Sequence, residues 1–385
     1  MRIVYCINSI SHIGGIARVV VAKANALAAI EGNEVWIAYT DVDALNPHPA
    51  LPLDSRVHTI DLGIRYYADD TRGLYYRLRA DTLLRRRHKA ALSKVLDSVQ
   101  PDIVISVGQS EKYFLPKLQL RKRPAFVREF HYNKRYRHEG ARGAIAKIKA
   151  TLTDFYDYSL QLRRYDAVAV LSEEDYRLNW SKSRMAGKTH VIPNPLTEIH
   201  DISADMNART VVTTGRLTYQ KNHEALLRTW SIVARRHPDW KLVIYGTGEL
   251  ENSLRQQISD LGLDNSVSMP GNVSDVCAHM AGGSIFAFTS RFEGFGLVLL
   301  EAASIGMPAV SFACPCGPRD IITDGVDGYL VEPGDENALA ERLCHLIENE
   351  SLRRRMGTEA LKNSRRYAPA IIAEQWMNLF RKLLK

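Results

Sequence analysis

At the start of the chain, the pattern of hydrophobic and polar positions alternates between β-rich runs and a run with helical spacing. RIVYCI (2–7) is β-rich, a turn region with Gly14-Gly15 follows, and the apolar residues of 16–28 recur with helical spacing. EVWIAY (34–39) is again β-rich. Strand, glycine loop, helix and strand form a βαβ unit, which predicts a parallel sheet. Five more runs in the first half are predicted as strands: VHTIDL (57–62), DIVISV (102–107), AFVREF (125–130), AVAVL (167–171) and THVIP (189–193).

Regular structure must break at Pro193-Asn194-Pro195, because two prolines flank one residue. A polar stretch follows, and then a second βαβ series begins. Its predicted strands are TVVTTG (210–215), KLVIYG (241–246), SVSMPG (266–271), SIFAFT (284–289), PAVSF (308–312) and GYLV (328–331), with helices at 222–236, 249–261, 296–306 and 335–349. The pattern predicts two parallel α/β halves joined near 194–205, with a ligand-binding cleft between the carboxyl ends of their strands.

Composition narrows the class of protein. The 385 residues exceed the usual size of one domain, so we expect two, which we place at 1–195 and 196–368. Hydrophobic residues make up 45% and charged residues 24%, which excludes a disordered or fibrous protein. The start of the chain lacks the apolar core of a signal peptide, and no run of about 18 apolar residues predicts a membrane span. Five scattered cysteines do not form a disulfide framework, and we expect a soluble protein in the cytoplasm.

Positive charge is concentrated in the first half of the chain. Residues 1–195 carry 31 Lys and Arg against 20 Asp and Glu, whereas residues 196–385 carry 20 against 23. Residues 72–149 alone hold 20 basic and 6 acidic side chains. Such asymmetry favours a polyanionic partner, which could be a nucleic acid, an anionic membrane or a phosphate-bearing substrate. A solvated helical face is the alternative.

Glycines and cations follow the first strand of each half. Gly14-Gly15 would let backbone N–H groups approach a phosphate at a helix start, although a double glycine alone is more often a plain turn. In the second half, Arg216 comes directly after the strand and Lys221 follows five residues later. An arginine fork and a lysine point charge suit a diphosphate, and the alternative is a surface pair beside a helix start.

The strongest local pattern is EGFGLVLLE, which runs from Glu293 to Glu301 after an apolar strand. Its glycines open a predicted helix, where backbone N–H groups can bind an anion or sugar hydroxyls. Both ionised carboxylates are acceptors suited to hydroxyl groups. The alternatives are a loop charge at Glu293 and a favourable charge in an early helical turn at Glu301.

His131 ends the β-rich run AFVREFH, where it could line the cleft, although a histidine at a strand end is often structural. The other histidines lack metal-ligand spacing, and Cys314-x-Cys316 has no second cysteine pair. The sequence contains no P-loop, HExxH or GxSxG motif.

Taken together, these segments resemble the retaining glycosyltransferases of family 4, which have the GT-B fold. The matching pieces are Gly14-Gly15, the histidine at 131, VIPNP (191–195), GRLTYQKN (215–222), YGTGEL (245–250), EGFGLVLLEA (293–302), PCGPRDII (315–322) and DGVDGYLVEPGD (324–335). Glu293 and Glu301 match the family's E-x7-E motif. The resemblance implies two Rossmann-like domains facing across a cleft, and we expect a final helix (369–385) to pack back on the N-terminal domain.

The resemblance also implies roles for individual residues. Arg216 and Lys221 would hold the diphosphate, Glu301 the ribose hydroxyls and Glu293 the transferred sugar, with His131 beside the anomeric centre. The expected catalytic set is therefore His131, Arg216, Lys221 and Glu293. The expected donor site comprises Gly15, Gly215, Arg216, Lys221, Gly246, Asn272, Glu293, Gly294, Phe295, Gly296, Leu297 and Glu301. No metal or other cofactor is expected, because Arg216 and Lys221 can replace a divalent cation at the diphosphate.

Acceptor binding in this family falls to the N-terminal half. There, aromatic residues are interleaved with the positive charge of 72–149, a combination that suits an anionic leaflet. We therefore expect a UDP-sugar donor and a lipid-linked glycan acceptor at the inner face of the cytoplasmic membrane, and no nucleic acid. The alternatives are another GT-B-type enzyme, such as a sugar-nucleotide epimerase or a phosphorylase, and a non-catalytic nucleic-acid-binding protein. The aromatic residues are Tyr66, Tyr67, Tyr75, Tyr76, Tyr113, Phe114, Tyr132 and Tyr136.

Overall fold

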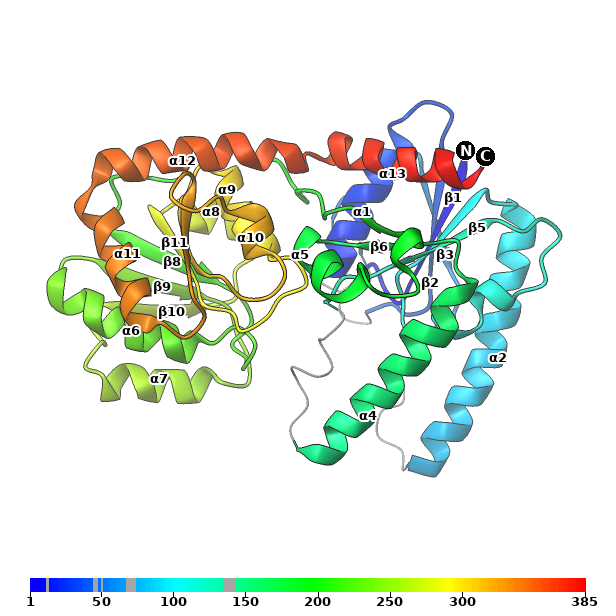
Figure 1. The fold of residues 1–385 in the computed structure, drawn as a ribbon, viewed down its shortest axis with the longest axis horizontal. Helices are drawn as coiled ribbons and strands as arrows, with labels where there is room; N and C mark the ends of the chain where they lie inside the picture. The colour runs from blue at the N-terminus through cyan, green and yellow to red at the C-terminus, as the bar shows by residue number, and fades with distance from the viewer. Residues whose placement is uncertain (12–13, 44–47, 50, 67–73, 134–142) are drawn as a thin grey trace. The chain divides into compact units, whose positions relative to one another are not determined.

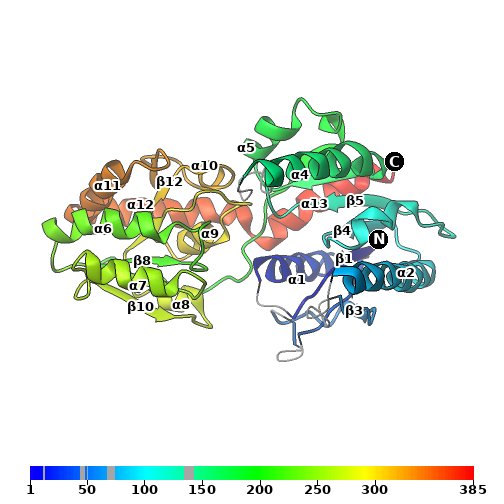
Figure 2. The ribbon, with the colours of Figure 1, turned by 90° about the horizontal axis from the view of Figure 1, so that it is seen from below.

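The computed structural model describes residues 1–11, 14–43, 48–49, 51–66, 74–133 and 143–385. The chain divides into two compact units, and helices flank the sheet of each (Figures 1 and 2). Unit 1 comprises Met1–Leu171, Tyr176–Thr197 and Ala368–Lys385, and unit 2 comprises Ser172–Asp175 and Glu198–Tyr367.

Unit 1 is built on a seven-stranded parallel sheet in the order β3-β2-β1-β4-β5-β6-β7. Its strands β4, β5 and β6 are buried along their whole length, which explains their largely apolar runs. The strands are β1 (Arg2–Ile7), β2 (Glu34–Tyr39), β3 (Val57–Asp61), β4 (Ile103–Ser106), β5 (Ala125–Glu129), β6 (Ala167–Val170) and β7 (Thr189–Val191).

The helices of unit 1 differ in how much of their surface they bury. In α1, Val20, Ala24 and Leu27 form a buried stripe, and α1 packs against α13. In α2, Leu92 and Leu96 are buried, whereas in α4 only Ala150 is. The helices and short helical segments are α1 (Gly15–Ala28), α2 (Leu74–Val99), η1 (Glu111–Tyr113), η2 (Leu115–Lys117), α4 (Ala144–Asp154), η3 (Phe155–Gln161), η4 (Leu162–Arg164), η5 (Tyr176–Trp180), η6 (Ala186–Lys188) and α13 (Pro369–Leu383).

Unit 2 contains a six-stranded parallel sheet in the order β10-β9-β8-β11-β12-β13. The strands are β8 (Thr210–Thr214), β9 (Lys241–Tyr245), β10 (Val267–Gly271), β11 (Ile285–Phe288), β12 (Ala309–Phe312) and β13 (Gly328–Val331). The helical segments are α5 (Glu173–Asp175), α6 (His223–Arg236), α7 (Glu251–Asp260), α8 (Val276–Met280), α9 (Leu297–Ser304), α10 (Pro318–Ile321), α11 (Glu336–Glu348), α12 (Glu350–Ser364) and η7 (Arg365–Tyr367).

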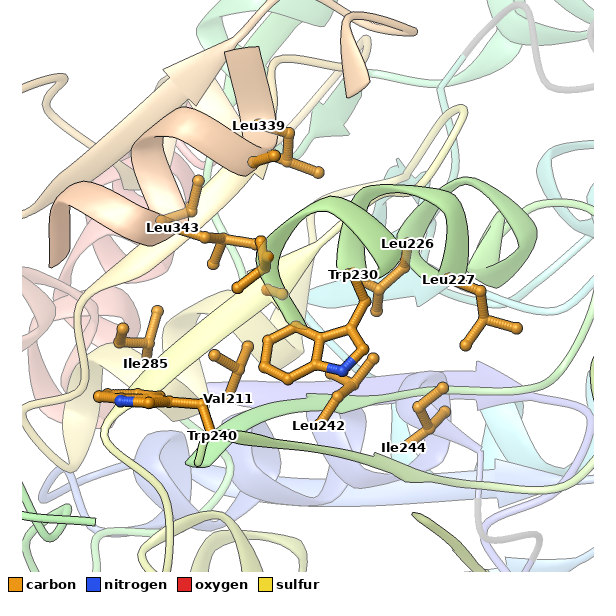
Figure 3. Close-up of a cluster of buried hydrophobic side chains, with 14 of the residues drawn as sticks. Val211, Leu226, Leu227, Trp230, Trp240, Leu242, Ile244, Ile285, Leu339 and Leu343 are labelled. Atoms are coloured by element: carbon orange, nitrogen blue, oxygen red, sulfur yellow. The ribbon is translucent and has the colours of Figure 1, made fainter. Parts of the chain in front are cut away.

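The core cluster of unit 2 joins this sheet to α6, α7, α11 and α12. Trp230 of α6 is fully buried, and it lies with Val211 and Leu242 of the sheet and Leu339 of α11 (Figure 3). Burying an indole of this size removes about 150–250 Å² of surface from water, so this cluster holds α6 firmly on the sheet. The N-terminus of α6, where the loop from β8 ends, is thereby fixed.

Every strand predicted from the hydrophobic runs is confirmed, and most are one or two residues shorter than the run. The predicted parallel α/β fold is confirmed as well, with one sheet in each unit. In both sheets the first strand of the series lies beside the fourth, so the strand order reverses between β1 and β4 and between β8 and β11. Ligands of open α/β sheets bind at such reversal points, at the carboxyl ends of the strands.

No helix in the described ranges is both long enough and apolar enough to cross a bilayer.

Candidate functional site

Two loops meet at the reversal point of unit 2. One runs from Gly215 to Asn222 between β8 and α6, and the other from Thr289 to Gly296 between β11 and α9. Asn222 Nδ2 donates a hydrogen bond to the Thr289 carbonyl at 3.1 Å, and Thr289 Oγ1 donates to the Asn222 carbonyl at 3.2 Å. The Arg291 N–H also donates to the Gln220 carbonyl at 2.8 Å. These bonds join the loops into one rigid ledge.

The ledge brings two predicted site residues into contact. Lys221 Nζ lies 2.8 Å from Glu293 Oε1, and their side chains are 15% and 8% exposed. Gln220, which the sequence did not single out, donates from Nε2 to the Phe292 carbonyl at 3.0 Å and to Glu293 Oε2 at 3.4 Å. The Lys221 ammonium also lies 5.5 Å from the centre of the Phe288 ring. A cation and a carboxylate are thus fixed side by side, with Lys221 partly exposed and Glu293 buried.

Two glycines allow the loops to pack this closely. A Cβ atom on Gly215 would lie 3.2 Å from Lys221 Cε, so the lysine side chain lies across this glycine. A Cβ atom on Gly246 would lie 2.0 Å from the Gly215 carbonyl oxygen, which no side chain can tolerate. Gly246 also has a φ of 138°, a conformation that favours glycine. The backbone therefore requires glycine at position 246, and Gly215 leaves room for the Lys221 side chain.

The Glu293 loop is supported from β12 as well. The Glu293 N–H donates to the Pro315 carbonyl at 3.2 Å, and a Cβ on Gly317 would lie 1.9 Å from the Phe295 carbonyl. The Phe295 ring is buried with its edge against Tyr367, at 5.7 Å between centroids. Sequence reasoning matched PCGPRDII to the family without recognising it as the support for this loop.

The other predicted donor residues occupy the same edge of the sheet. Gly296 has a φ of 90° and caps α9, which begins at Leu297, and Glu301 is buried in the second turn of that helix. Arg216 is exposed on the first loop. Asn272 is exposed directly after β10, and Gly294 is half-buried. The structure thus places these residues around the carboxyl ends of β8, β9, β10 and β11, where the side chains of Lys221 and Glu293 touch.

Two predicted residues belong to unit 1. Gly15 is exposed at the start of α1, and residues 12–13 before it lie outside the described ranges. His131 lies two residues beyond β5, with only 4% of its side chain exposed. Burial lowers the pKa of His131, and the neighbouring Glu129 carboxylate partly opposes this shift. The neutral imidazole is therefore the form present at neutral pH.

His131 is held by a buried ion pair that sequence reasoning missed. His131 Nε2 lies 3.2 Å from Glu129 Oε1, and Lys23 Nζ of α1 donates a hydrogen bond to the same oxygen. The Lys23 and Glu129 side chains are each 1% exposed. Burial raises the pKa of Glu129, but interactions with the neighbouring Lys23 and His131 outweigh this effect and lower it to about 2. No sequence motif connects residues 106 positions apart.

The described ranges contain neither a cluster of metal-ligating side chains nor a disulfide. Across the described ranges, no three His, Cys, Asp or Glu side chains are grouped so that they could hold a metal ion. The expectation of a metal-free donor site stays a prediction. All five cysteines lie in described ranges, each is buried, and no disulfide joins them.

Comparison with known proteins assigns the family. The model described as "Glycosyltransferase Family 4" matches residues 13–197, and the one described as "Glycosyl transferases group 1" matches residues 197–363. The chain belongs to the family 4 glycosyltransferases. The two matches meet at residue 197, so together they cover β2 to β13 and the ledge between β8 and β11.

Two curated family members illustrate the range of relatives. The amylovoran biosynthesis glycosyltransferase AmsD of Erwinia amylovora is 35% identical over 48% of this chain and 52% of its own length. A Campylobacter jejuni transferase, named for adding 4-alpha-N-acetylgalactosamine to a diphospho-undecaprenol-linked sugar, is 33% identical over 42% of this chain and 44% of its own length. The chain spans between 24% and 61% of the length of three curated relatives that it matches.

Solved structures confirm the fold of this glycosyltransferase. A mutant of Staphylococcus aureus TarM, crystallised with fondaparinux, alpha-GlcNAc-glycerol and UDP, superposes with a TM-score of 0.76. The match covers 98% of this chain and 99% of TarM at 16% identity. The predicted family and the predicted pair of Rossmann-like domains of the GT-B fold are thus both confirmed.

Proposed function

We propose that this chain is a retaining glycosyltransferase, which moves a hexose or N-acetylhexosamine from a UDP-sugar to a glycan acceptor. The Lys221–Glu293 pair on the ledge of unit 2 carries this proposal. A ledge at the reversal point suits a nucleotide, and its fixed cation suits a diphosphate. Family membership, and the presence of UDP in the TarM crystal, support the same donor class.

The donor rearranges the ion pair when it binds. The diphosphate takes over the Lys221 ammonium, and Arg216, which is exposed on the same loop, provides a second cation. Glu293 is thereby released to accept hydrogen bonds from the sugar hydroxyls. Glu301 binds the ribose, the backbone N–H groups from Gly294 to Leu297 contact sugar and phosphate, and Gly15, Gly246 and Asn272 complete the site. No metal ion takes part, since two cations neutralise the leaving diphosphate.

The transfer retains the configuration of the sugar through attack by the acceptor on the face that the diphosphate leaves. We propose this route because the sequence of the first half offers no carboxylate clearly placed as a nucleophile. His131 lies beside the anomeric centre, where a neutral ring does not repel the positive charge that develops. Breaking the sugar–phosphate bond gives UDP, and the proton of the attacking hydroxyl leaves with the diphosphate.

A lipid-linked precursor of a cell-surface polysaccharide is the acceptor we propose. The name of the Campylobacter jejuni relative specifies a diphospho-undecaprenol carrier, and that of AmsD specifies polysaccharide biosynthesis. Such an acceptor requires contact with a membrane, which we place at the cytoplasmic face. Nucleic acid is not part of this proposal.

Unit 1 carries a surface that suits this contact. In α4, Ile145, Ile148 and Leu152 are 84%, 61% and 66% exposed, and their spacing puts them on one side of the helix. Lys147 and Lys149 are exposed on the same helix. The basic residues Arg85, Arg86 and Arg87 are exposed on α2, and α2 and α4 extend past the sheet in the same direction (Figure 1). Apolar anchors combined with lysine and arginine are typical of helices that lie on anionic lipid.

A donor screen tests the reaction. The protein is first mixed with UDP-, GDP-, ADP- and dTDP-sugars, and the ligand that raises the melting temperature most is taken forward. That donor is then incubated with lipid-linked acceptors, and NMR determines the anomeric configuration of the product. We expect a UDP-sugar and a retained configuration. An inverted product would refute retention, and conversion of the UDP-sugar without any acceptor would identify an epimerase.

Vesicle sedimentation tests the membrane surface. Binding to anionic vesicles is expected to be strong at low salt and to weaken as ionic strength approaches physiological values, where the Debye length is about 8 Å. Replacing Arg85, Arg86 and Arg87 by glutamate, or Ile145, Ile148 and Leu152 by serine, is expected to abolish it. The matched control reverses three exposed basic residues of α12 and must bind normally. These are Arg354, Arg355 and Lys362.

The same experiment separates the membrane from the alternatives. If the unmutated protein does not bind anionic vesicles at low salt, the proposed membrane contact is refuted. Binding to RNA or DNA that the Arg85–Arg87 reversal removes would instead support a nucleic-acid-binding protein. Self-association that the Ile145, Ile148 and Leu152 variant removes would mean that a second copy covers α4.

A further inference from the structure

We propose that Lys23 and Glu129 are positioning residues for His131, and that together they hold its ring neutral with the proton on Nε2. Glu129 Oε1 is shared between Lys23 Nζ and His131 Nε2, which lies 3.2 Å away. Lys23 belongs to α1, Glu129 is the last residue of β5, and His131 lies two residues after that strand. This inference rests on the proposed function only in giving His131 a part in the reaction.

The Lys23–Glu129 ion pair is almost completely buried. The Lys23 ammonium lies 5.8 Å from the centre of the Tyr5 ring and 5.3 Å from that of Trp376 in α13. Tyr5 and Trp376 are each 0% exposed. Two aromatic faces attract the ammonium and exclude water from it. A buried ion pair of this kind is no more stable than well-packed apolar residues of the same volume, so stability alone does not explain it.

Glu129 determines which nitrogen of His131 carries the proton. His131 Nε2 and Glu129 Oε1 lie 3.2 Å apart without the alignment of a hydrogen bond. A negative oxygen at this distance attracts an N–H and repels a lone pair, so the proton belongs on Nε2. In a neutral ring the lone pair then lies on Nδ1. The charged groups that act on His131 are Glu129, Lys23 and Arg128, and burial together with the two cations lowers its pKa while Glu129 raises it.

Lys23 compensates the charge of Glu129 and so keeps His131 from gaining a proton. An isolated carboxylate beside His131 would favour the imidazolium, whose charge would oppose the positive charge at the anomeric carbon. Because Lys23 neutralises Glu129, the carboxylate orients the ring without protonating it. Removing either partner must therefore shift the titration of His131, and the two shifts must be opposite in sign.

The test measures both shifts in the full-length protein. Glu129→Gln removes the acceptor charge, and it is expected to lower the pKa of His131 and to leave both tautomers populated. Lys23→Met leaves the Glu129 charge uncompensated, and it is expected to raise the pKa of His131. The readout is ¹⁵N NMR of the imidazole nitrogens across pH 4–9, with the His131 signals assigned by their loss in His131→Gln.

The pH dependence of turnover provides the second readout. For Glu129→Gln, kcat is expected to fall about 10²-fold, as for a misplaced reacting group, with the donor KM within about twofold. For Lys23→Met, kcat is expected to fall about tenfold at pH 7 and to recover at pH 9, because the imidazolium loses its proton. Phe380→Leu is the matched control, because this fully buried ring of α13 lies 5.6 Å from the Trp376 ring and carries no charge.

The double variant Lys23→Met/Glu129→Gln keeps the experiment decisive if either single variant unfolds. It replaces the ions by a neutral pair of similar volume, so the fold is expected to survive. Its His131 should show a mixture of tautomers. An unchanged Nε2–H tautomer in the double variant, or shifts of equal sign in the single variants, overturns the inference. Absence of transferase activity in the unmutated protein refutes the proposed function instead, since the NMR readout does not depend on turnover.

Discussion

Each unit contains a lysine–glutamate pair, and the two pairs differ in one respect that decides what they can do. Lys221 and Glu293 join two loops at the reversal point of unit 2, and 15% and 8% of their side chains remain exposed. Lys23 and Glu129 lie between a helix and a strand of unit 1, and only 1% of each is exposed. Access to solvent, and not residue type, determines whether such a pair can exchange partners with a ligand.

The energetics of the two pairs follow from this difference. In the open pair, water or a diphosphate replaces a lost partner, so each residue is free to serve the donor. In the closed pair, neither ion has a substitute, because Tyr5 and Trp376 surround the ammonium. We therefore expect the open pair to affect binding and catalysis and the closed pair to affect folding and the state of His131.

The largest expected effect is on stability. Lys23→Met leaves a buried carboxylate without its ion partner, and the free energy of unfolding is expected to fall by about 3–5 kcal/mol. The matched variant Lys221→Met is expected to cost about 1 kcal/mol or less, because Glu293 can be hydrated. Urea denaturation followed by circular dichroism measures both. Equal losses in the two variants would show that the pairs do not differ in the way we describe.

Next in size is the effect of Lys221 on turnover. Lys221→Ala is expected to reduce kcat/KM about 10²-fold or more, as for the loss of an electrostatic contact to the transition state. Initial rates with a UDP-sugar and an acceptor measure it. The unmutated protein should keep its activity in EDTA, because Arg216 and Lys221 supply the positive charge. Activity that EDTA abolishes and Mn²⁺ restores would contradict a metal-free donor site.

The two carboxylates of the E-x7-E motif should separate in binding measurements. UDP contains the ribose and lacks the sugar, so Glu301→Ala is expected to weaken its binding by roughly 1–3 kcal/mol. Glu293→Ala is expected to leave UDP binding nearly unchanged and to impair turnover. Isothermal titration calorimetry measures the UDP affinity of both variants. Similar losses of affinity would show that Glu293 and Glu301 do not have the separate roles proposed.

The smallest effect concerns two buried histidines, one in each unit. Burial lowers the pKa of both His88 and His223 to about 4. Between pH 7 and pH 5 the unfolded chain therefore binds protons that the folded chain does not, and stability falls as the pH falls. Each histidine is expected to account for about 2 kcal/mol of this loss. His88→Gln and His223→Gln should each flatten the pH dependence, whereas the exposed control His345→Gln should not.

The sequence predicts the central strands of this fold because helices bury both faces of each sheet there. A strand such as β11 must be apolar throughout, and so it stands out against the polar loops around it. The glycines of the EGFGLVLLE segment mark the start of α9 in the same way, since Gly296 needs a left-handed conformation. Local chemistry determines these features, and a local pattern therefore finds them.

The rest depends on contacts between residues that are distant in the sequence. Asn222 and Thr289 join the two ledge loops, yet each looks like an ordinary cap or loop residue in its own segment. Lys23 falls on the buried side of α1, where the helical period alone predicts an apolar residue. Only the pairing with Glu129 explains a lysine there, and that pairing depends on how the helix is placed over the sheet.

The last helix of the chain has a consequence for the order in which the protein is made. Unit 1 begins at the first residue, but α13, which covers Lys23 with Trp376, follows all of unit 2. A ribosome that has released residues 1–367 has therefore supplied every part of unit 2, while the ammonium of Lys23 still lacks one of its two aromatic faces. Unit 1 therefore completes its folding after unit 2. A nonsense mutation before Pro369 is expected to destabilise unit 1 more than unit 2.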